Sequence, residues 1–226
     1  MKIAGIHPNS FVDMKGMIAY VVFTRGCNLN CWYCHNRDII SDGEGLYDAD
    51  KVLDDIEFRK GFIDIVVISG GEPTLQTGLK DFILKVKKSG LKVKLDTNGT
   101  NPDIIEDFIK DGLVDFISMD IKAPYEKYDK IAGRQTDINA VKRSVAVLMN
   151  SPVDYEFRTT FCPELSREDI IKIAVSIKGA RLYALQQFVP SAKIIKKHFG
   201  PHSREYIQTT ADEASKYVRV CVRGLV

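Results

Sequence analysis

The sequence contains no apolar run long enough to cross a membrane, and its start has no pattern of a secretion signal. It also lacks an excess of either charge, because 32 lysines and arginines face 30 aspartates and glutamates, for a net charge of +2. A nearly neutral chain gives no electrostatic reason to bind nucleic acid. The densest basic run, residues 193–198, is expected to be a solvated helix face or linker. We therefore expect a cytoplasmic protein with neither membrane nor nucleic-acid partners.

Internal repeats, low-complexity segments and breaks in composition are also missing. The hydrophobic content of 45% and the charged content of 27% are ordinary for a globular protein. A chain of 226 residues is long enough to bury a substantial hydrophobic core, so it does not need disulfides or bound metals for its stability. We predict a single domain over residues 1–226.

Cysteine is scarce, with 5 in the chain, yet three of them fall in the short stretch 27–34. Cys27, Cys31 and Cys34 follow the apolar run 18–23. Thiolates so close in sequence cannot join distant elements, so we expect them to bind one common metal centre. Three thiolates hold three corners of a [4Fe–4S] cluster, because each iron takes one outer ligand, and the fourth iron is then free to bind something else.

Two other interpretations stay open on spacing alone. A zinc site of the three cysteines and His35 would satisfy tetrahedral coordination, although the adjacent Cys34 and His35 would chelate one ion awkwardly. A structural disulfide would leave an odd thiol and suits a secreted chain better. The isolated Cys162 and Cys221 are expected to be packing residues.

Apolar runs alternate with amphipathic stretches along the chain. Strands are predicted over residues 17–24, 63–69, 91–97, 114–121, 153–160 and 180–188. Helices are predicted over residues 48–60, 76–89, 102–111, 138–150 and 166–178, and a last helix at 203–215 precedes a short strand near 217–223. Such alternation implies parallel strands joined by right-handed crossovers.

The predicted strands have one apolar face and one charged face. In the strand at 153–160, Tyr155 and Phe157 alternate with Glu156 and Arg158. A sheet covered by helices on both faces should be apolar on both. The alternation therefore predicts a curved sheet with helices outside and a polar interior, an α/β fold of the incomplete (β/α)6 TIM-barrel type.

Polar groups gather where the predicted strands end, which is where barrel enzymes place their chemistry. Polar residues at the end of a single strand are typical of an ordinary turn. Polar residues at the ends of five consecutive strands predict a ligand-binding site. Paired glycines at one of them would let a ligand approach the main chain closely. In chain order the candidates are Gly70, Gly71 and Glu72; Asp96, Thr97 and Asn98; Asp120 and Lys122; Arg158; and Gln187.

The cysteine spacing, followed by Gly70-Gly71-Glu72-Pro73, resembles the radical S-adenosylmethionine (SAM) superfamily. The likeness runs from about residue 8 to Gly224 and extends to the glycyl-radical-enzyme activases, above all to the activating proteins of anaerobic ribonucleoside-triphosphate reductase. The matching stretches are Ser10–Asp13, Cys34–Asn36, Asp96–Gly99, Asp120 with Lys122, and Arg158. The chain departs from the pattern at Met14 and Lys15, where relatives often have proline, and at Gln187, where some have histidine.

The resemblance implies a [4Fe–4S] cluster and SAM as cofactors, with the amino and carboxylate groups of SAM on the open iron. The segment from Gly70 to Glu72 would accept hydrogen bonds from the SAM ammonium, and Arg158 or Lys122 would meet its carboxylate. The adenine would lie near Trp32 and Tyr33. Further cofactor-binding candidates are Asn36, Asn98 and Gln187.

The carboxylates of Asp96 and Asp120 would contact the ribose of SAM or bind a small cation. Two unpaired buried carboxylates repel one another, so we expect Na⁺ or K⁺ between them, completed by Thr97 and the Ser118 carbonyl. The alternative is that Lys94 and Lys122 neutralise the pair directly.

The activity implied by the resemblance is reductive cleavage of SAM to methionine and a 5′-deoxyadenosyl radical. That radical would remove a hydrogen from a glycine Cα of a partner glycyl radical enzyme, most of all the large subunit of anaerobic ribonucleotide reductase. Reduced flavodoxin or ferredoxin would supply the electron. Two alternatives remain: a radical SAM enzyme with a small substrate, similar to the 7-carboxy-7-deazaguanine synthases, and a zinc-stabilised binding module without catalysis.

The segment Ile6–Lys15 precedes the first predicted strand, so we expect it near the open side of the barrel. There its polar residues would read the partner's glycine loop. The alternative is that the segment closes the bottom of the barrel.

Overall fold

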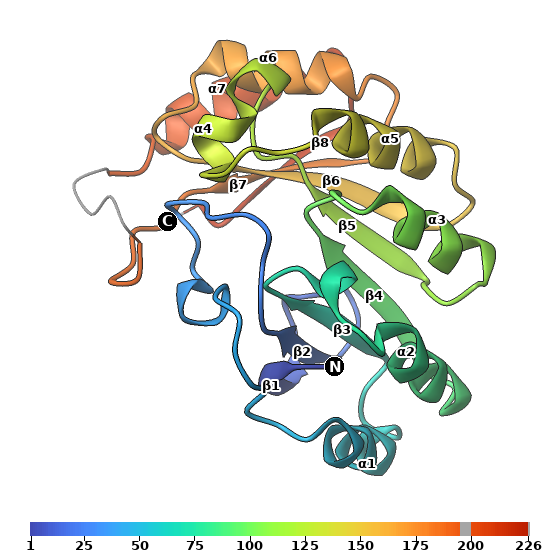
Figure 1. The fold of residues 1–226 in the computed structure, drawn as a ribbon. Helices are drawn as coiled ribbons and strands as arrows, with labels where there is room; N and C mark the ends of the chain where they lie inside the picture. Colours follow the sequence, from blue (N-terminus) through green and yellow to red (C-terminus); the bar gives the residue numbers. More distant parts are fainter. Residues whose placement is uncertain (195–199, 226) are drawn as a thin grey trace.

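The computed structural model describes residues 1–194 and 200–225, in which a curved eight-stranded sheet has helices on its convex side (Figure 1). Residues 195–198 of the predicted basic run lie outside the described residues. Each strand is hydrogen-bonded to its neighbour in sequence. The strands are β1 Ile3–Ser10, β2 Ala19–Thr24, β3 Ile65–Gly70, β4 Lys92–Thr97, β5 Phe116–Asp120, β6 Asp154–Phe161, β7 Tyr183–Gln187 and β8 Val220–Arg223.

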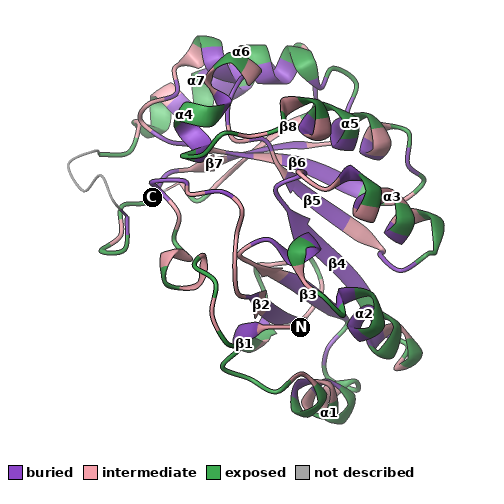
Figure 2. Ribbon diagram, viewed as in Figure 1, coloured by how far each residue is buried: buried purple, intermediate pink, exposed green. Residues whose placement is uncertain are grey.

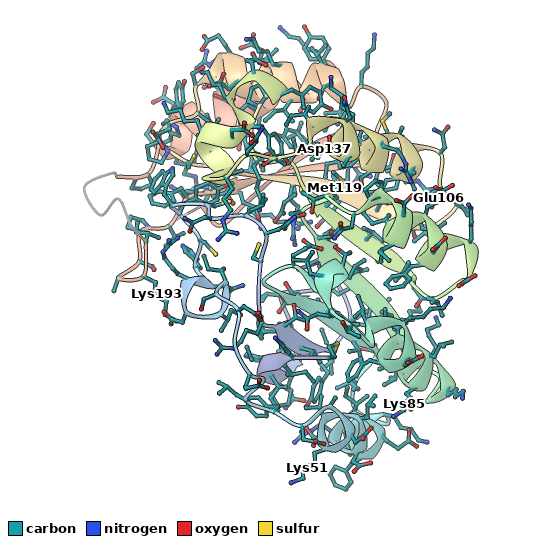
Figure 3. All side chains as sticks on the ribbon, in the orientation of Figure 1. Lys51, Lys85, Glu106, Met119, Asp137 and Lys193 are labelled. Carbon is teal, nitrogen blue, oxygen red and sulfur yellow. The ribbon has the colours of Figure 1, made fainter. Side chains whose placement is uncertain are left out.

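Apart from α4 Tyr128–Ala132, which lies in none of the predicted stretches, the α-helices follow the amphipathic stretches closely, and several have the predicted end signals. Ser166 and Asp169 form a reciprocal capping box at the start of α6, as the sequence predicts. On the outer surface, Lys85 of α2 pairs with Asp50 of α1 at 2.8 Å (Figure 3). The α-helices are α1 Ala49–Arg59, α2 Leu79–Lys88, α3 Pro102–Lys110, α4 Tyr128–Ala132, α5 Ile138–Met149, α6 Arg167–Ser176 and α7 Arg204–Ala214. Short 3-10 helices lie at η1 Arg37–Ile39, η2 Pro73–Leu75 and η3 Tyr125–Lys127. None of the helices in the described residues is long and apolar enough to span a bilayer.

The sheet confirms an incomplete barrel, with two strands more than the six of the predicted repeat. From β2 to β8 all pairs are parallel, and β1 adds an antiparallel strand at one edge. Strand β1 has no clear alternating pattern, because it contains Gly5 and Pro8 and is only partly buried. Since β1 and β8 are the two edges of the sheet, the barrel is open between them.

The core fills the space between the sheet and the helices, where the buried residues gather (Figure 2). A second, smaller apolar cluster joins β2 and β3, with Val21 and Val67 among its members. Met14 and Met17, from the turn between β1 and β2, pack against this cluster. The interior is therefore apolar along β2 and β3, and the charged face predicted from alternation belongs to β4–β6.

The turn between β1 and β2 closes the lower end of the barrel. Because Ser10 pairs with Ala19, this turn lies at the start of β2, whereas the cysteine loop follows its end. The buried Lys94 donates a hydrogen bond from Nζ to the Asp13 carbonyl at 2.6 Å. The structure thus divides the segment Ile6–Lys15: residues 11–15 lie in the turn at the bottom of the barrel, whereas Ile6–Ser10 belongs to edge strand β1, beside the opening. The role of the segment in reading a partner stays a prediction.

Candidate active site at the cysteine loop

A cavity of about 350 Å³ lies where the parallel strands end. The cysteine loop lines one part of it and the ends of β3–β8 line the rest. Of the predicted site residues, the cavity is lined by Cys27, Cys31, Tyr33, Cys34, Asn36, Gly70, Gly71, Asp96, Thr97, Asn98, Asp120, Lys122, Arg158 and Gln187. Glu72 and Ser118 are buried and are not among the lining residues. For Glu72 this argues against direct contact with a ligand, whereas the contact of the Ser118 carbonyl with a cation stays a prediction.

Main-chain hydrogen bonds hold the cysteine loop in place. The Gly26 N–H donates to the Ile39 carbonyl at 2.8 Å, which brings the end of the loop back beside its start. The Asn30 N–H donates to the Ala132 carbonyl at 2.8 Å and ties the middle of the loop to α4. Beside the loop, Lys193 pairs with Asp38 at 2.5 Å (Figure 3). The three thiols thus lie on a backbone fixed at both ends.

The paired glycines secure this loop, in addition to lining the cavity. A Cβ on Gly70 would lie 2.4 Å from the Thr24 nitrogen, and a Cβ on Gly71 would lie 2.0 Å from the Gly26 carbonyl oxygen. The Gly71 N–H donates to the Thr24 carbonyl at 2.9 Å. The reason for these glycines is therefore the close approach of β3 to the start of the cysteine loop. We call the cysteine loop and Gly70–Gly71 together the cysteine wall.

Glu72 turns its carboxylate away from the cavity and joins two strand ends. It accepts hydrogen bonds from the Thr74 hydroxyl at 2.5 Å, the Thr97 hydroxyl at 2.8 Å and the Asn98 N–H at 2.7 Å. Burial raises the pKa of Glu72, although these hydrogen bonds oppose the rise. The Asn98 side chain then donates to Asn28 Oδ1 at 2.8 Å and lies 4.0 Å from Cys27 Sγ. Glu72 is thus a structural link from β3 and β4 to the cysteine loop.

The ends of β4, β5 and β6 form a second wall, which we call the charged wall: Asp96, Asp120, Lys122 and Arg158. Arg158 Nε lies 2.8 Å from Asp120 Oδ1, and its Nη1 lies 3.2 Å from Asp96 Oδ2. Lys122 Nζ lies 2.9 Å from Asp120, and Lys94 Nζ lies 3.3 Å from Asp96. The parallel register places Asp120 directly beside Arg158. Arg158 therefore joins the two carboxylates into one network.

This network neutralises the two carboxylates without a metal ion. Burial opposes ionisation of Asp120, but Arg158 and Lys122 hold its pKa well below the ordinary value. The pKa of Asp96 is also lowered, by Arg158 and Lys94 acting against burial. The repulsion that led us to expect Na⁺ or K⁺ is thus relieved by side chains, while the Ser118 hydroxyl donates to Glu156 at 2.8 Å. The cation itself stays a prediction.

One cavity residue missed by the sequence analysis lies at the end of β8. Arg223 pairs with the buried Glu156 through two contacts, at 2.9 and 2.6 Å. Counting this pair, four cations (Lys94, Lys122, Arg158 and Arg223) face three carboxylates (Asp96, Asp120 and Glu156). The excess positive charge suits a ligand carboxylate. Alternation along β6 could have indicated Thr160, but the placement of Arg223 depends on how β8 docks beside β7.

The aromatic residues of the loop and His35 differ from expectation. Trp32 is 4% exposed, and its ring centroid lies 5.4 Å from that of Phe188, outside the cavity lining. Only Tyr33 of the two predicted aromatic residues lines the cavity. His35, the fourth ligand of the zinc alternative, has Nε2 2.8 Å from the Val189 carbonyl oxygen. The structure therefore gives His35 a role in joining the loop to the segment after β7.

The donor set fits an iron–sulfur cluster. Cys27, Cys31 and Cys34 are free and line the same cavity. Burial raises the pKa of Cys27 to about 11, and burial also raises the pKa of Cys31. At neutral pH these thiols keep their protons until a metal displaces them. Three cysteines supply three of the four outer ligands of a [4Fe–4S] cluster.

Residues 21–177 match the Radical SAM superfamily, and the chain belongs to it. Within that superfamily it is a relative of the activating enzymes of glycyl radical enzymes. A protein of Methanocaldococcus jannaschii, MJ1227, provisionally named a glycyl-radical enzyme activating enzyme, is 37% identical over 197 residues, covering 83% of this chain and 80% of that protein. The pyruvate formate-lyase-activating enzyme of Staphylococcus epidermidis is 29% identical over 225 residues, covering 91% of this chain and 88% of that one. Membership of the superfamily implies a [4Fe–4S] cluster and SAM.

Solved structures support the fold. Streptococcus suis SuiB bound to its precursor peptide SuiA aligns with a TM-score of 0.71 and 15% identity over 90% of this chain, which spans only 48% of the SuiB chain. Coproporphyrinogen III oxidase of Escherichia coli, a radical SAM enzyme, aligns with a TM-score of 0.62 and 12% identity over 88% of this chain and 51% of its own. At these identities the likeness concerns the fold alone.

Proposed function

We propose that this chain cleaves SAM reductively and uses the resulting 5′-deoxyadenosyl radical to remove a hydrogen from a glycine Cα of a partner enzyme. The observation that carries the proposal is the meeting, in a single cavity, of three free cysteines with the charged wall and Arg223, which together give the lining three cations against two carboxylates. When bound, a [4Fe–4S] cluster supplies the electron that breaks the bond between sulfur and C5′ of SAM.

The two walls have separate tasks in this proposal. Cys27, Cys31 and Cys34 would hold the cluster and leave one iron without a protein ligand. Arg158 or Lys122 would meet the SAM carboxylate, since both already lie in the cavity as cations. Holding the sulfonium beside the reductant makes the electron transfer effectively unimolecular.

The smaller groups would orient the rest of the cofactor. We assign the ammonium of SAM to main-chain oxygens of Gly70 and Gly71, since Glu72 is turned away. The Gly70 carbonyl already accepts from Asn36 Nδ2 at 3.1 Å, and a carbonyl oxygen has a second lone pair for a ligand. Asp96 would contact the ribose, and Tyr33, Asn98 and Gln187 would line the remaining surface of SAM.

As the partner we propose the large subunit of anaerobic ribonucleotide reductase, with reduced flavodoxin or ferredoxin as electron donor. Support comes from the resemblance along nearly the whole chain. Pyruvate formate-lyase is a second candidate, favoured by the similarity to its activating enzyme over 91% of this chain. In either case the opening between the edge strands β1 and β8 gives a polypeptide loop a lateral route to the cavity.

The test is anaerobic incubation of the reduced, iron-loaded protein with SAM and each candidate partner, followed by electron paramagnetic resonance. A glycyl doublet with one partner and not the other identifies the substrate. Cleavage of SAM without a doublet in either mixture would contradict the activase proposal and favour a small substrate, such as that of the 7-carboxy-7-deazaguanine synthases.

A further inference from the structure

A second cavity lies against the cysteine loop, outside the one that would hold SAM. The two cavities share Cys27 and Ile40 in their linings, so the loop is the partition between them. The second cavity is lined otherwise by the chain start, the approach to the loop, residues 41–42 after η1, residues 75–77 and the segment after α4. Its cations are Lys2, Arg25 and Arg134, and its carboxylate is Asp42. Nothing in the SAM chemistry described above uses these three cations.

The three cations come from separate segments, and main-chain contacts fix each segment to the loop or its approach. The Arg25 N–H donates to the Lys2 carbonyl at 2.9 Å, two residues before Cys27. Gly133, just before Arg134, approaches the loop so closely that a Cβ there would lie 2.2 Å from the Asn30 carbonyl oxygen. The positions of these cations relative to Cys27 are therefore set by the fold.

Their charge is only partly balanced. Lys2 Nζ pairs with Asp42 at 2.7 Å. Within residues 1–194 and 200–225, neither Arg25 nor Arg134 has a carboxylate partner, and Arg134 is exposed. Arg25 Nε is buried and lacks a hydrogen-bond partner in this part of the chain. An unbalanced pair of guanidinium groups beside a cluster ligand suits a partner with surface carboxylates.

We propose that this surface, Lys2, Arg25 and Arg134 around the second cavity, is the docking site of an acidic electron-transfer protein that reduces the enzyme through the Cys27 side of the loop. The proposal rests on the function proposed above and deepens it. One electron leaves the reduced flavodoxin or ferredoxin, which becomes oxidised by one electron, and one molecule of SAM is cleaved. The electron thereby enters from the face opposite the SAM cavity, which leaves the barrel opening free for the glycine loop.

The test compares Arg134→Glu with Arg219→Glu, an exposed arginine that lines neither cavity. The first readout is binding of oxidised flavodoxin and oxidised ferredoxin by calorimetry at low and high salt. We expect Arg134→Glu to weaken binding of the donor about tenfold at low salt and much less at high salt, because screening removes the electrostatic contribution. Arg219→Glu should bind like the unaltered protein.

The second readout is 5′-deoxyadenosine formed without a glycyl radical partner. With reduced flavodoxin or ferredoxin below saturation, Arg134→Glu should be about tenfold slower, whereas with dithionite all three proteins should react equally. Unchanged binding and unchanged donor-driven cleavage in Arg134→Glu would overturn the docking site. The docking site would also be overturned if Arg134→Glu were reduced normally by the donor but formed no glycyl doublet when the partner enzyme is added, since the surface would then bind the partner enzyme. Failure of the unaltered protein to cleave SAM even with dithionite would instead contradict the function proposed above.

Discussion

The cysteine wall is held by main-chain hydrogen bonds and by glycines that leave no room for a side chain, whereas the charged wall of the same cavity is held by side-chain ion pairs. The first wall carries Cys27 and Cys31, and burial raises the pKa of both thiols. The second keeps Asp120, Lys122 and Arg158 ionised by mutual contact, despite burial. One wall is therefore specified by shape and the other by charge balance, so different substitutions should damage each.

The largest effect is expected from removing a thiol of the cysteine wall. Cys31→Ser should abolish the bound iron and reductive cleavage of SAM, because a hydroxyl is a poor ligand for an iron–sulfur cluster and two cysteines remain. Iron per chain after anaerobic reconstitution measures this. Cys221→Ser, on β8 and outside both cavity linings, is the matched control and should load normally. Full iron content in Cys31→Ser would rule out the assigned ligands.

The next largest effect should come from breaking the charged wall. Asp120→Asn leaves Arg158 and Lys122 buried with one counter-charge fewer, and breaking a buried pair in this way costs about 3–5 kcal/mol of unfolding free energy. Urea denaturation of iron-free protein at pH 7 measures the loss. Asp103→Asn, which breaks an exposed pair with Arg143, is the control and should change the unfolding free energy by less than about 1 kcal/mol.

The unfolding free energies of the wild type and of Asp120→Asn should depend differently on pH. The pKa of Asp120 is lowered in the fold, so its stabilisation is complete above the ordinary value of 3.8 and is lost as the pH falls through the folded pKa. The difference in unfolding free energy between the wild type and Asp120→Asn should therefore become smaller as the pH is lowered from 5 toward 3. A gap that stays constant with pH would show that packing, and not charge, accounts for the loss.

The contrast between the walls also explains what could be predicted from the sequence. The cysteine ligands lie close together in sequence, so their spacing alone indicates a shared metal site. Asp120 and Arg158 are far apart, but strand alternation and the parallel order place both inside the barrel at the same end. The strand and helix runs were predicted to within a few residues because their periodicity is strong.

What failed depended on partners outside each segment. The side chain of Glu72 turns from the cavity because Thr97 and Asn98, at the end of the next strand, donate to it. Arg223 enters the cavity only because β8 docks beside β7 and lets it reach Glu156. Edge strand β1 is defined by its antiparallel pairing with β2 and not by its own sequence pattern. Such contacts are tertiary and leave no local signal.

The smallest of the three effects tests the claim that shape specifies the cysteine wall. Gly71→Ala adds one methyl group, which would lie 2.0 Å from the Gly26 carbonyl oxygen, so either β3 or the start of the loop must shift. Overpacking of this kind costs about 1–3 kcal/mol. We also expect less iron per chain, because Cys27 directly follows the displaced residue.

The matched control is Gly61→Ala, where an added Cβ meets nothing within 4 Å. That change should shift the unfolding free energy by about 0.5 kcal/mol or less and leave iron loading intact. The comparison separates shape from charge because neither substitution alters a charged group. If Gly71→Ala loads iron fully and unfolds like Gly61→Ala, the close approach of β3 to the loop is not what holds the thiols in place. In that case the hydrogen bonds from Gly26 and Asn30 to the far end of the loop and to α4 would suffice to fix them.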